Sequence, residues 1–294
     1  MIKNTAKQLF LGALCIAASI TSLTALAESS VWKVSKGNDH IFIGGTVHIL
    51  PASEFPLPAE FEQAYQKSNI IVLEAKLPDA SDTDFQMKMM QQMAYGQNKT
   101  IGDFLSAKTK QNLSQYISAL GVDLMMFERF KPGFLMTMLA LLEAQKAGLS
   151  GEGVDIFYSN KAKKDNKKLA YLEIAEFQMN MIANMGVGNE EKFVKSNLEQ
   201  MKDFKSMFLG LLKAWRAGDE KQLNTLAIEP MKDDPNTIKT LLTDRNKNWI
   251  PHIEQMFSGN RSDKELVLVG VAHLAGNNSV LALLKAKGYR VEKL

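Results

Sequence analysis

Four short apolar runs in this sequence each lead into a side chain that can bind a metal or transfer a proton. His48 and His273 follow two of the runs, and Glu74 and Glu173 close the other two. Short runs of aliphatic and β-branched residues bounded by turn residues predict buried strands of the kind found in parallel sheets. The carboxyl ends of parallel strands meet at one edge of a sheet, where the loops diverge and leave a crevice. The sequence therefore predicts a sheet with two histidines and two glutamates along a single edge.

Both histidines belong to the same local pattern, Gly45-Thr46-Val47-His48 and Gly270-Val271-Ala272-His273. The glycine permits either a strained turn or a close approach of the backbone to a ligand. Two imidazoles and a carboxylate form a ligand set suited to Mn, Fe, Co or Zn, with open positions for water and substrate. Gly-x-x-His is common by chance, however, and a structural hydrogen-bonding role is the alternative for each histidine. For Glu74 and Glu173, the alternative to a functional role is that each is simply the first exposed residue of a loop.

The remaining pattern predicts a sheet built by both ends of the chain. A hairpin is expected over Val31–Gly45, and a strand–helix–strand unit with parallel strands over Glu265–Leu294. Helical periodicity over about 83–150 and 175–258 predicts a large helical insertion in two blocks. The expected fold class is α/β (α+β), a mixed central sheet formed by both chain ends with a large helical insertion.

Residues 1–27 have the features of an export signal. Lys3 and Lys7 form a basic head, an apolar stretch follows, and small residues before Glu28 offer a cleavage site. An uncleaved membrane anchor is the alternative, but the stretch is short and interrupted by serine and threonine. The sequence therefore predicts a mature domain of 28–294 in the bacterial periplasm, without stable membrane insertion.

Charge and cysteine content narrow the classes of function. The chain has 35 basic and 32 acidic residues, and loss of Lys3 and Lys7 with the signal leaves a net charge of +1. No global field therefore favours nucleic acid as a partner. The single cysteine, Cys15, lies within the expected signal, so disulfides and thiol chemistry are excluded for the mature chain. The sequence also lacks a Gly-x-Ser-x-Gly elbow, a His-Glu-x-x-His helix and a phosphate-binding glycine loop.

Two further groups of residues suggest ligand binding. Arg245 and Asn246 are the predicted substrate-binding pair, because a guanidinium can hold a carboxylate with two parallel hydrogen bonds; a surface arginine is the alternative. Thioethers bind Cu(I), and four methionines follow one another closely at Met87, Met89, Met90 and Met93. Their helical spacing favours packing between helices over copper binding.

Taken in order, the motifs resemble the TraB/PrgY/GumN-like family, which also includes the Tiki metalloproteases of animals. The resemblance covers about Val31–Leu294. It is carried by Phe42-Ile43-Gly44-Gly45-Thr46-Val47-His48, Pro56-Leu57-Pro58, Ile71-Val72-Leu73-Glu74, Lys131-Pro132, Gly153-Val154-Asp155, Leu172-Glu173 with Gln178, Asp244-Arg245-Asn246, Val269-Gly270-Val271-Ala272-His273-Leu274-Ala275-Gly276 and Gly288-Tyr289. One departure is Ile174, where the family often has threonine.

The resemblance implies a single domain with a sheet core related to the erythromycin-esterase and ChaN-like folds, wrapped by helices. It also implies that His48, Glu74, Arg245 and His273 match the family's proposed active-site positions. In Tiki-like members the implied activity is metal-dependent peptide cleavage, with Mn or Co favoured. The pheromone-shutdown branch suggests peptide binding or sequestration instead.

The leading hypothesis is a periplasmic metal-dependent hydrolase that acts on peptides and uses a divalent metal, Mn, Co or Zn. His48, Glu74 and His273 are the predicted metal ligands. Glu74 or Glu173 is the predicted general base, and Arg245 orients substrate or stabilises developing negative charge. The alternatives are a non-catalytic peptide or small-ligand binding protein and a haem or iron binding protein. The substrate, the metal and the oligomeric state are not specified by the sequence.

Overall fold

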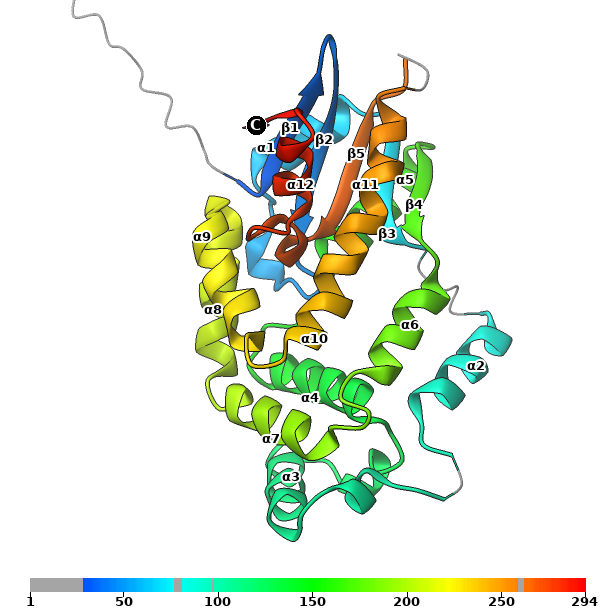
Figure 1. The fold of residues 1–294 in the computed structure, drawn as a ribbon, viewed down its shortest axis with the longest axis vertical. Coiled ribbons are helices and arrows are strands. Elements are labelled where there is room, and N and C mark those ends of the chain that lie inside the picture. Colours follow the sequence, from blue (N-terminus) through cyan, green and yellow to red (C-terminus); the bar gives the residue numbers. More distant parts are fainter. Residues whose placement is uncertain (1–28, 77–80, 97, 259–261) are drawn as a thin grey trace, which may run out of the picture.

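The computed structural model describes residues 29–76, 81–96, 98–258 and 262–294, so the expected signal at 1–27 lies outside the described residues. Within them, six strands form one mixed sheet in the order β4-β3-β5-β2-β1-β6. The strands are β1 (Val31–Lys36), β2 (Asp39–Thr46), β3 (Ile70–Ala75), β4 (Lys168–Glu173), β5 (Glu265–Gly270) and β6 (Arg290–Lys293). The predicted fold class is confirmed, because strands from both chain ends lie side by side and helices fill the sequence between them (Figure 1).

Strand direction sets where the site can lie. β2, β5, β3 and β4 run parallel to one another, whereas β1 is antiparallel to both β2 and β6. β6 therefore runs in the same direction as β5, as the expected strand–helix–strand unit requires. The two strands are not neighbours, because β2 and β1 lie between them. The carboxyl ends of the four parallel strands share one edge of the sheet.

Helices cover both faces of the sheet, which explains why its central strands are apolar along their whole length. One face packs on α1 (Ala59–Gln66), α5 (Val154–Lys164) and α8 (Phe204–Ala217), and the other on α11 (Asp244–Met256) and α12 (Val280–Ala286). Along β5, Leu266 and Leu268 face the first layer, and Val267 and Val269 face the second. All six residues of β5 are buried.

The helical insertion forms a separate layer beyond the carboxyl edge of the sheet (Figure 1). It contains α2 (Thr83–Met93), α3 (Ala107–Ala119), α4 (Pro132–Lys146), α6 (Ala175–Asn184) and α7 (Glu190–Met201). Residues of α3, α4 and α7 build a core of their own, including Leu113, Leu135 and Val194. Met89 and Met93 pack between α2 and α6, whereas Met87 and Met90 are exposed.

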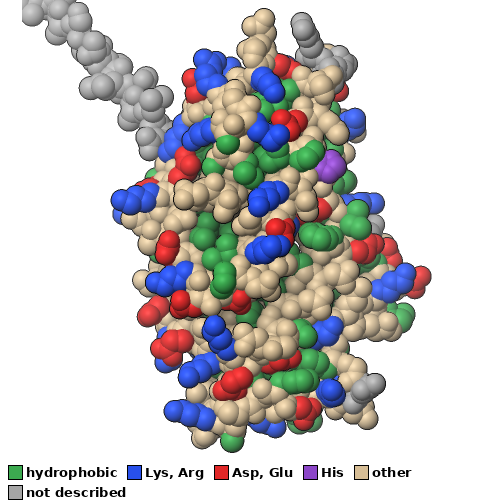
Figure 2. Space-filling view, in the orientation of Figure 1, with side chains coloured by type: hydrophobic (Ala, Val, Ile, Leu, Met, Phe, Trp, Pro, Cys, Tyr) green, Lys and Arg blue, Asp and Glu red, His purple; other side chains and the backbone are tan. Residues whose placement is uncertain are grey.

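Short helical segments complete the chain. They are the 3-10 turns Ala52–Glu54, Ile101–Phe104, Leu124–Met126, Glu229–Met231 and Val271–Leu274, the helices α9 (Glu220–Leu223) and α10 (Pro235–Ile238), and the π-helical turns Asn224–Ile228 and Lys239–Thr243. In the described part of the chain, no helix is long and apolar enough to cross a membrane. Basic and acidic side chains are interspersed over the face shown in Figure 2.

Candidate functional site

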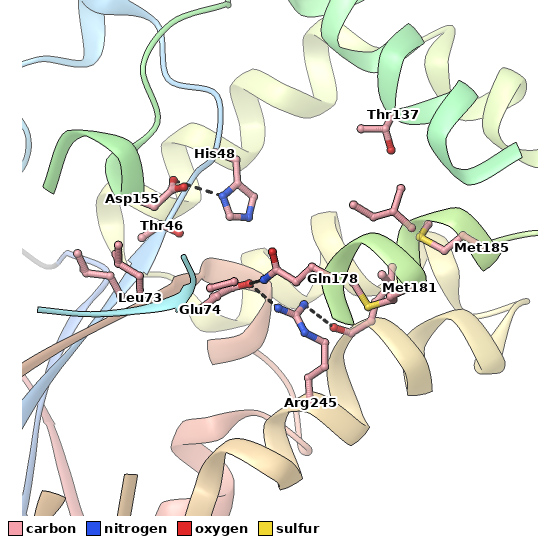
Figure 3. A pocket seen from close by; sticks show the side chains of 14 residues that line it. Thr46, His48, Leu73, Glu74, Thr137, Asp155, Gln178, Met181, Met185 and Arg245 are labelled. Carbon is pink, nitrogen blue, oxygen red and sulfur yellow. Dashed lines mark hydrogen bonds and ion pairs between the residues drawn. The ribbon is translucent and has the colours of Figure 1, made fainter. Parts of the chain in front are cut away.

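A pocket of about 430 Å³ lies between the carboxyl edge of the sheet and the helical insertion. Its polar side is lined by His48, Glu74, Asp155, Gln178 and Arg245, and its apolar side by Met181, Ile182, Met185 and Leu241 (Figure 3). Mostly apolar walls with a few convergent polar groups are typical of a ligand site. The pocket lies where the sequence predicted the crevice.

Gly270, the last residue of β5, leaves open the space around which the predicted metal ligands gather. A methyl group on this glycine would lie 3.2 Å from Glu74 Oε1, 3.4 Å from His48 Nε2 and 3.6 Å from His273 Cδ2. Its φ of −49° is available to any residue. The glycine therefore does not make a strained turn, and its backbone lies close to the side chains of the site. Gly45 instead lies against the core, since a methyl group there would lie 2.8 Å from Val271 Cγ2.

The Glu74 carboxylate is fixed on both oxygens. Oε1 accepts a hydrogen bond of 2.6 Å from the Gly270 N–H, and Oε2 accepts bonds from Arg245 Nη2 and, at 3.0 Å, from Gln178 Nε2. Burial raises the pKa of this carboxyl, but its interactions with His273, Arg245 and His48 and the hydrogen bond from the Gly270 N–H outweigh burial and lower the pKa to about 2. Glu74 is therefore ionised at every ordinary pH.

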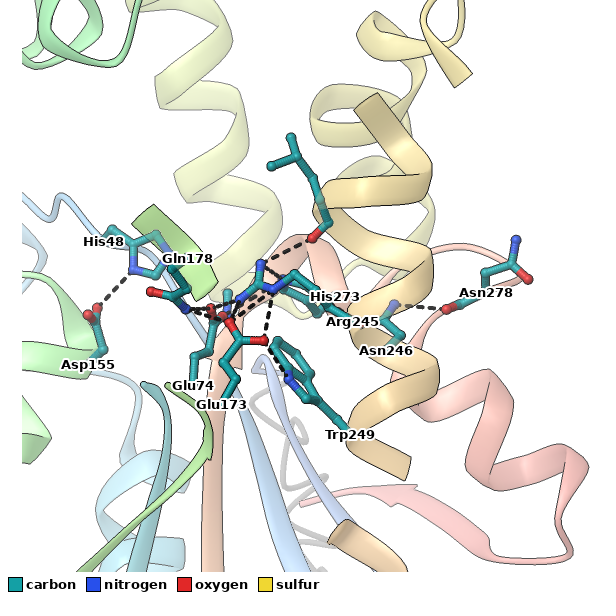
Figure 4. Close-up of polar contacts among 12 residues, drawn as sticks. His48, Glu74, Asp155, Glu173, Gln178, Arg245, Asn246, Trp249, His273 and Asn278 are labelled. Atoms are coloured by element: carbon teal, nitrogen blue, oxygen red, sulfur yellow. Dashed lines mark hydrogen bonds and ion pairs between the residues drawn. The ribbon is translucent and has the colours of Figure 1, made fainter. Parts of the chain in front are cut away.

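Arg245 is a buried cation between two carboxylates, with only 6% of its side chain exposed. Its Nε donates to Glu173, and its Nη2 donates to both Glu74 and Glu173. Its Nη1 lies 3.1 Å from Leu241 O and 3.0 Å from His273 Nε2. A guanidinium has five N–H donors, and all five are used within the protein (Figure 4). A substrate contact by Arg245, as the sequence predicted, would require one of these bonds to break.

Glu173 ends β4 and completes this buried cluster. Its Oε1 accepts from Arg245 and Gln178, and its Oε2 accepts a bond of 3.0 Å from Trp249 Nε1. The Trp249 ring also lies against Arg245, with the guanidinium carbon 4.7 Å from the ring centroid. Both carboxylates predicted as general bases are thus held by the same arginine.

His273 is buried, and both ring nitrogens are engaged. Asn246 Nδ2 donates to Asn278 O, which turns Asn246 Oδ1 towards His273 Nδ1 at 2.6 Å. Nδ1 therefore carries the proton, and Nε2 accepts from Arg245. Burial lowers the pKa of His273 to about 3, with Glu74 opposing and Arg245 assisting the shift, so the ring is neutral. Asn246, predicted to bind substrate, is only 2% exposed and lies behind this histidine.

His48 is the one predicted ligand whose side chain opens broadly into the pocket, with 63% of its surface exposed. Its Nδ1 lies 3.3 Å from Asp155 Oδ1, so Nε2 is directed towards the space above Gly270. The surrounding protein lowers the pKa of His48, but the hydrogen bond and charge of Asp155 and the charge of Glu74 raise it to about 9.

Asp155 and Gln178 contact the site but were not predicted as functional residues. The sequence feature that could have pointed to Asp155 is the Gly153-Val154-Asp155 motif. The structure shows why this motif begins with glycine. A methyl group on Gly153 would lie 2.4 Å from His48 O, and Val154 N donates to Val47 O at 3.1 Å. This close approach of α5 to the end of β2 places Asp155 beside His48.

The other two histidines lie elsewhere, His40 at the opposite end of β2 and His252 exposed on α11.

The donor set fits a divalent metal in its chemistry, but the side chains are not arranged to bind one together. Each histidine has its Nδ1 bound to an oxygen acceptor, which is how proteins fix a metal-binding imidazole with Nε2 as the ligand. Glu74 Oε1 lies 3.8 Å from His273 Nε2 across the common space. One contact opposes the fit, because Arg245 Nη1 uses the lone pair of His273 Nε2. As the side chains stand, no group of three histidine, cysteine, aspartate or glutamate side chains among the described residues is close enough to hold an ion. Arg245 Nη1 would have to leave His273 for all three ligands to bind together.

Parallel strands that carry a buried cluster of histidines, carboxylates and an arginine at their carboxyl edge define an α/β protein with its site in the strand-edge crevice. The chain belongs to the TraB/PrgY/gumN family, whose sequence profile matches residues 30–293. No curated protein and no solved structure matches the chain. The family resemblance expected from the motifs is confirmed over nearly the whole chain.

Proposed function

We propose that this protein is a metal-dependent hydrolase of the bacterial periplasm that acts on peptides. The observation that carries the proposal is the convergence of Glu74 Oε1, His48 Nε2 and the His273 ring around Gly270, with Glu74 and His48 also lining a largely apolar pocket. Membership of the family is compatible with this function but does not by itself establish an activity.

In this proposal His48, Glu74 and His273 hold the metal. The chemistry that a divalent ion supplies when bound is polarisation of a carbonyl group and acidification of a water molecule. Asp155 holds His48 in the tautomer that presents Nε2 to the pocket. The Gly270 N–H, Gln178 and Arg245 keep Glu74 ionised and aimed at the same space.

In many enzymes the acid and the base are two titratable groups whose surroundings shift their pKa values in opposite directions. The pKa of Glu74 is lowered to about 2 and that of His48 is raised to about 9, so one is a carboxylate and the other an imidazolium in the metal-free protein. Metal binding would require His48 to lose this proton, so that Nε2 is free to act as a ligand, whereas Glu74 stays ionised and lines the pocket, where it can accept a hydrogen bond from a water molecule. Glu173 does not line the pocket and both of its oxygens are engaged, so it positions Arg245.

The experiment is metal analysis of the purified mature protein, followed by digestion of a peptide library with added Mn, Co or Zn. We expect stoichiometric metal binding and cleavage by the wild type, and loss of both in a His48→Ala, His273→Ala double variant. Equal metal content and equal cleavage in the two proteins would contradict the proposal.

A second candidate function is capture of a peptide or small ligand without turnover. The observation that favours it is the contact between Arg245 Nη1 and His273 Nε2, which occupies the nitrogen that a metal would need. Mass spectrometry separates the two functions, since a captured peptide is recovered intact and a hydrolysed one is not.

A further inference from the structure

We infer that a groove beside α6, continuous with the candidate site, binds an uncharged, extended segment of the substrate through its apolar side chains. This α6 groove has a volume of about 390 Å³ and lies between α6 and the segment of α10 and the following π-helical turn. The inference rests on the proposed function, because it names the class of substrate that the site would take.

Two methionines connect the α6 groove to the pocket of the candidate site. Met181 on α6 and Met185, one helical turn later at the C-cap of α6, line both the pocket and the groove. In Figure 3 they lie on the side of the pocket that faces Glu74 and Arg245. A linear ligand whose reacting bond lies over Gly270 would therefore pass along these methionines into the groove. A compact ligand would fill the pocket alone.

The groove combines solvent-exposed apolar side chains with neutral polar ones. Phe177 and Val187 are large hydrophobic side chains that retain 41% and 45% of their surface in contact with solvent, and both line the groove. Exposed apolar side chains gathered around a concave surface mark binding sites on soluble proteins. Methionine is unbranched and polarisable, so Met181 and Met185 can adapt to side chains of different shape.

The groove has little charge with which to pair a charged ligand segment. Among the described residues that line it, Asp234 is the only charged one. Its carboxylate caps α10, accepting from Thr237 N at 3.1 Å and from Thr237 Oγ1 at 2.7 Å. The other polar lining residues are neutral, and the amides of Asn180 and Asn236 can both donate to and accept from a peptide backbone. The chemistry therefore matches a neutral peptide segment with aliphatic or aromatic side chains.

The test measures binding separately from cleavage. Fluorescence anisotropy is recorded for labelled eight-residue peptides of alanine and leucine, and for matched peptides in which glutamate or lysine replaces the leucines. Wild-type protein is compared with Phe177→Glu and Val187→Glu. Leu209→Glu on α8 is the matched control, because Leu209 is 44% exposed and does not line the groove.

We expect both groove variants to weaken binding of the neutral peptide about tenfold or more, since each removes the burial of one apolar side chain. Leu209→Glu should bind as the wild type does, and the charged peptides should bind weakly to all four proteins. Unchanged affinity in both groove variants, or equal affinity of the wild type for charged and neutral peptides, would overturn the inference. Groove-dependent binding without any cleavage would support the groove and count against the hydrolase. Cleavage of the neutral peptide with equal KM in wild type and groove variants would support the hydrolase and overturn the groove.

Discussion

At the scale of single residues, the site depends on one buried cation. Arg245 donates to Glu74, Glu173, His273 and the carbonyl of Leu241. Glu74 and Leu241 line the pocket, and Glu173 and His273 lie behind it. The π-helical turn Lys239–Thr243 ends directly before α11, and Leu241 lies within it. Local π geometry is frequent at functional sites, because it redirects backbone carbonyls. Arg245 therefore acts as a positioning residue in the structure.

Replacing Arg245 with methionine should leave two buried carboxylates without a counter-charge. Breaking a buried ion pair on one side costs about 3–5 kcal/mol, so we expect the free energy of unfolding of Arg245→Met to fall by about that amount in urea titrations. Arg216→Met is the control, because Arg216 pairs with Glu54 at 3.0 Å but is 41% exposed. A half-exposed pair is worth at most about 1 kcal/mol. Equal losses in the two variants would show that Arg245 is not the centre of the cluster.

His48 and Asp155 give a prediction about pH. In metal-free protein the surrounding protein lowers the pKa of His48, but the hydrogen bond and charge of Asp155 outweigh this and raise it to about 9. Because the folded-state pKa lies above the ordinary value of 6.5, stability from this pair is fully present below about pH 6.5 and fades as the pH rises through about 9. NMR titration of the imidazole in EDTA-treated protein should show this pKa, and Asp155→Asn should lower it towards 6.5. A titration of His48 unaffected by Asp155→Asn would refute the pairing.

At the scale of elements, the strand ends carry most of what the sequence could predict. Glu74 and Glu173 stand at the ends of apolar runs, and a parallel sheet brings such ends to one edge whatever the intervening chain does. Arg245 was predicted as a site residue, but its burial between Glu74 and Glu173 was not, since a polar helix gives no sign of which face it buries. Asp155 was missed because its role depends on α5 approaching His48 closely, a contact between segments more than a hundred residues apart.

The two glycines of the repeated pattern should respond differently to alanine. A methyl group on Gly45 meets Val271 Cγ2 at 2.8 Å and Ser30 Cβ at 3.2 Å, so Gly45→Ala overpacks the core, at a cost of about 1–3 kcal/mol. Gly270→Ala has an allowed backbone and projects into the space between Glu74 and His48, where the nearest atom is a carboxylate oxygen at 3.2 Å. We expect Gly270→Ala to retain most of its stability and to lose metal binding. Thermal unfolding and isothermal calorimetry on both variants test this, and a reversed pattern would contradict it.

At the scale of the whole molecule, the site joins parts that are far apart in the chain. His48 follows a strand near the beginning of the described chain, His273 follows a strand near its end, and Gln178 comes from the helical insertion. The sequence predicted a sheet made by both chain ends but not that β2 and β1 separate β5 from β6. That order depends on which edges pair, and burial patterns alone do not specify it.

Because His48 and His273 come from strands at opposite ends of the chain, a metal bound by both should stabilise the whole fold. A ligand that binds only the folded protein adds about 2.7 kcal/mol when its concentration is 100 times its Kd. We therefore expect Mn, Co or Zn to raise the Tm of the wild type, and EDTA to return it to the value of the metal-free protein. The His48→Ala, His273→Ala double variant should show no such rise. A His40→Ala, His252→Ala variant is the matched control, since those histidines lie away from the pocket and should leave the rise unchanged. An equal rise in the double variant of the site would mean that the metal binds elsewhere.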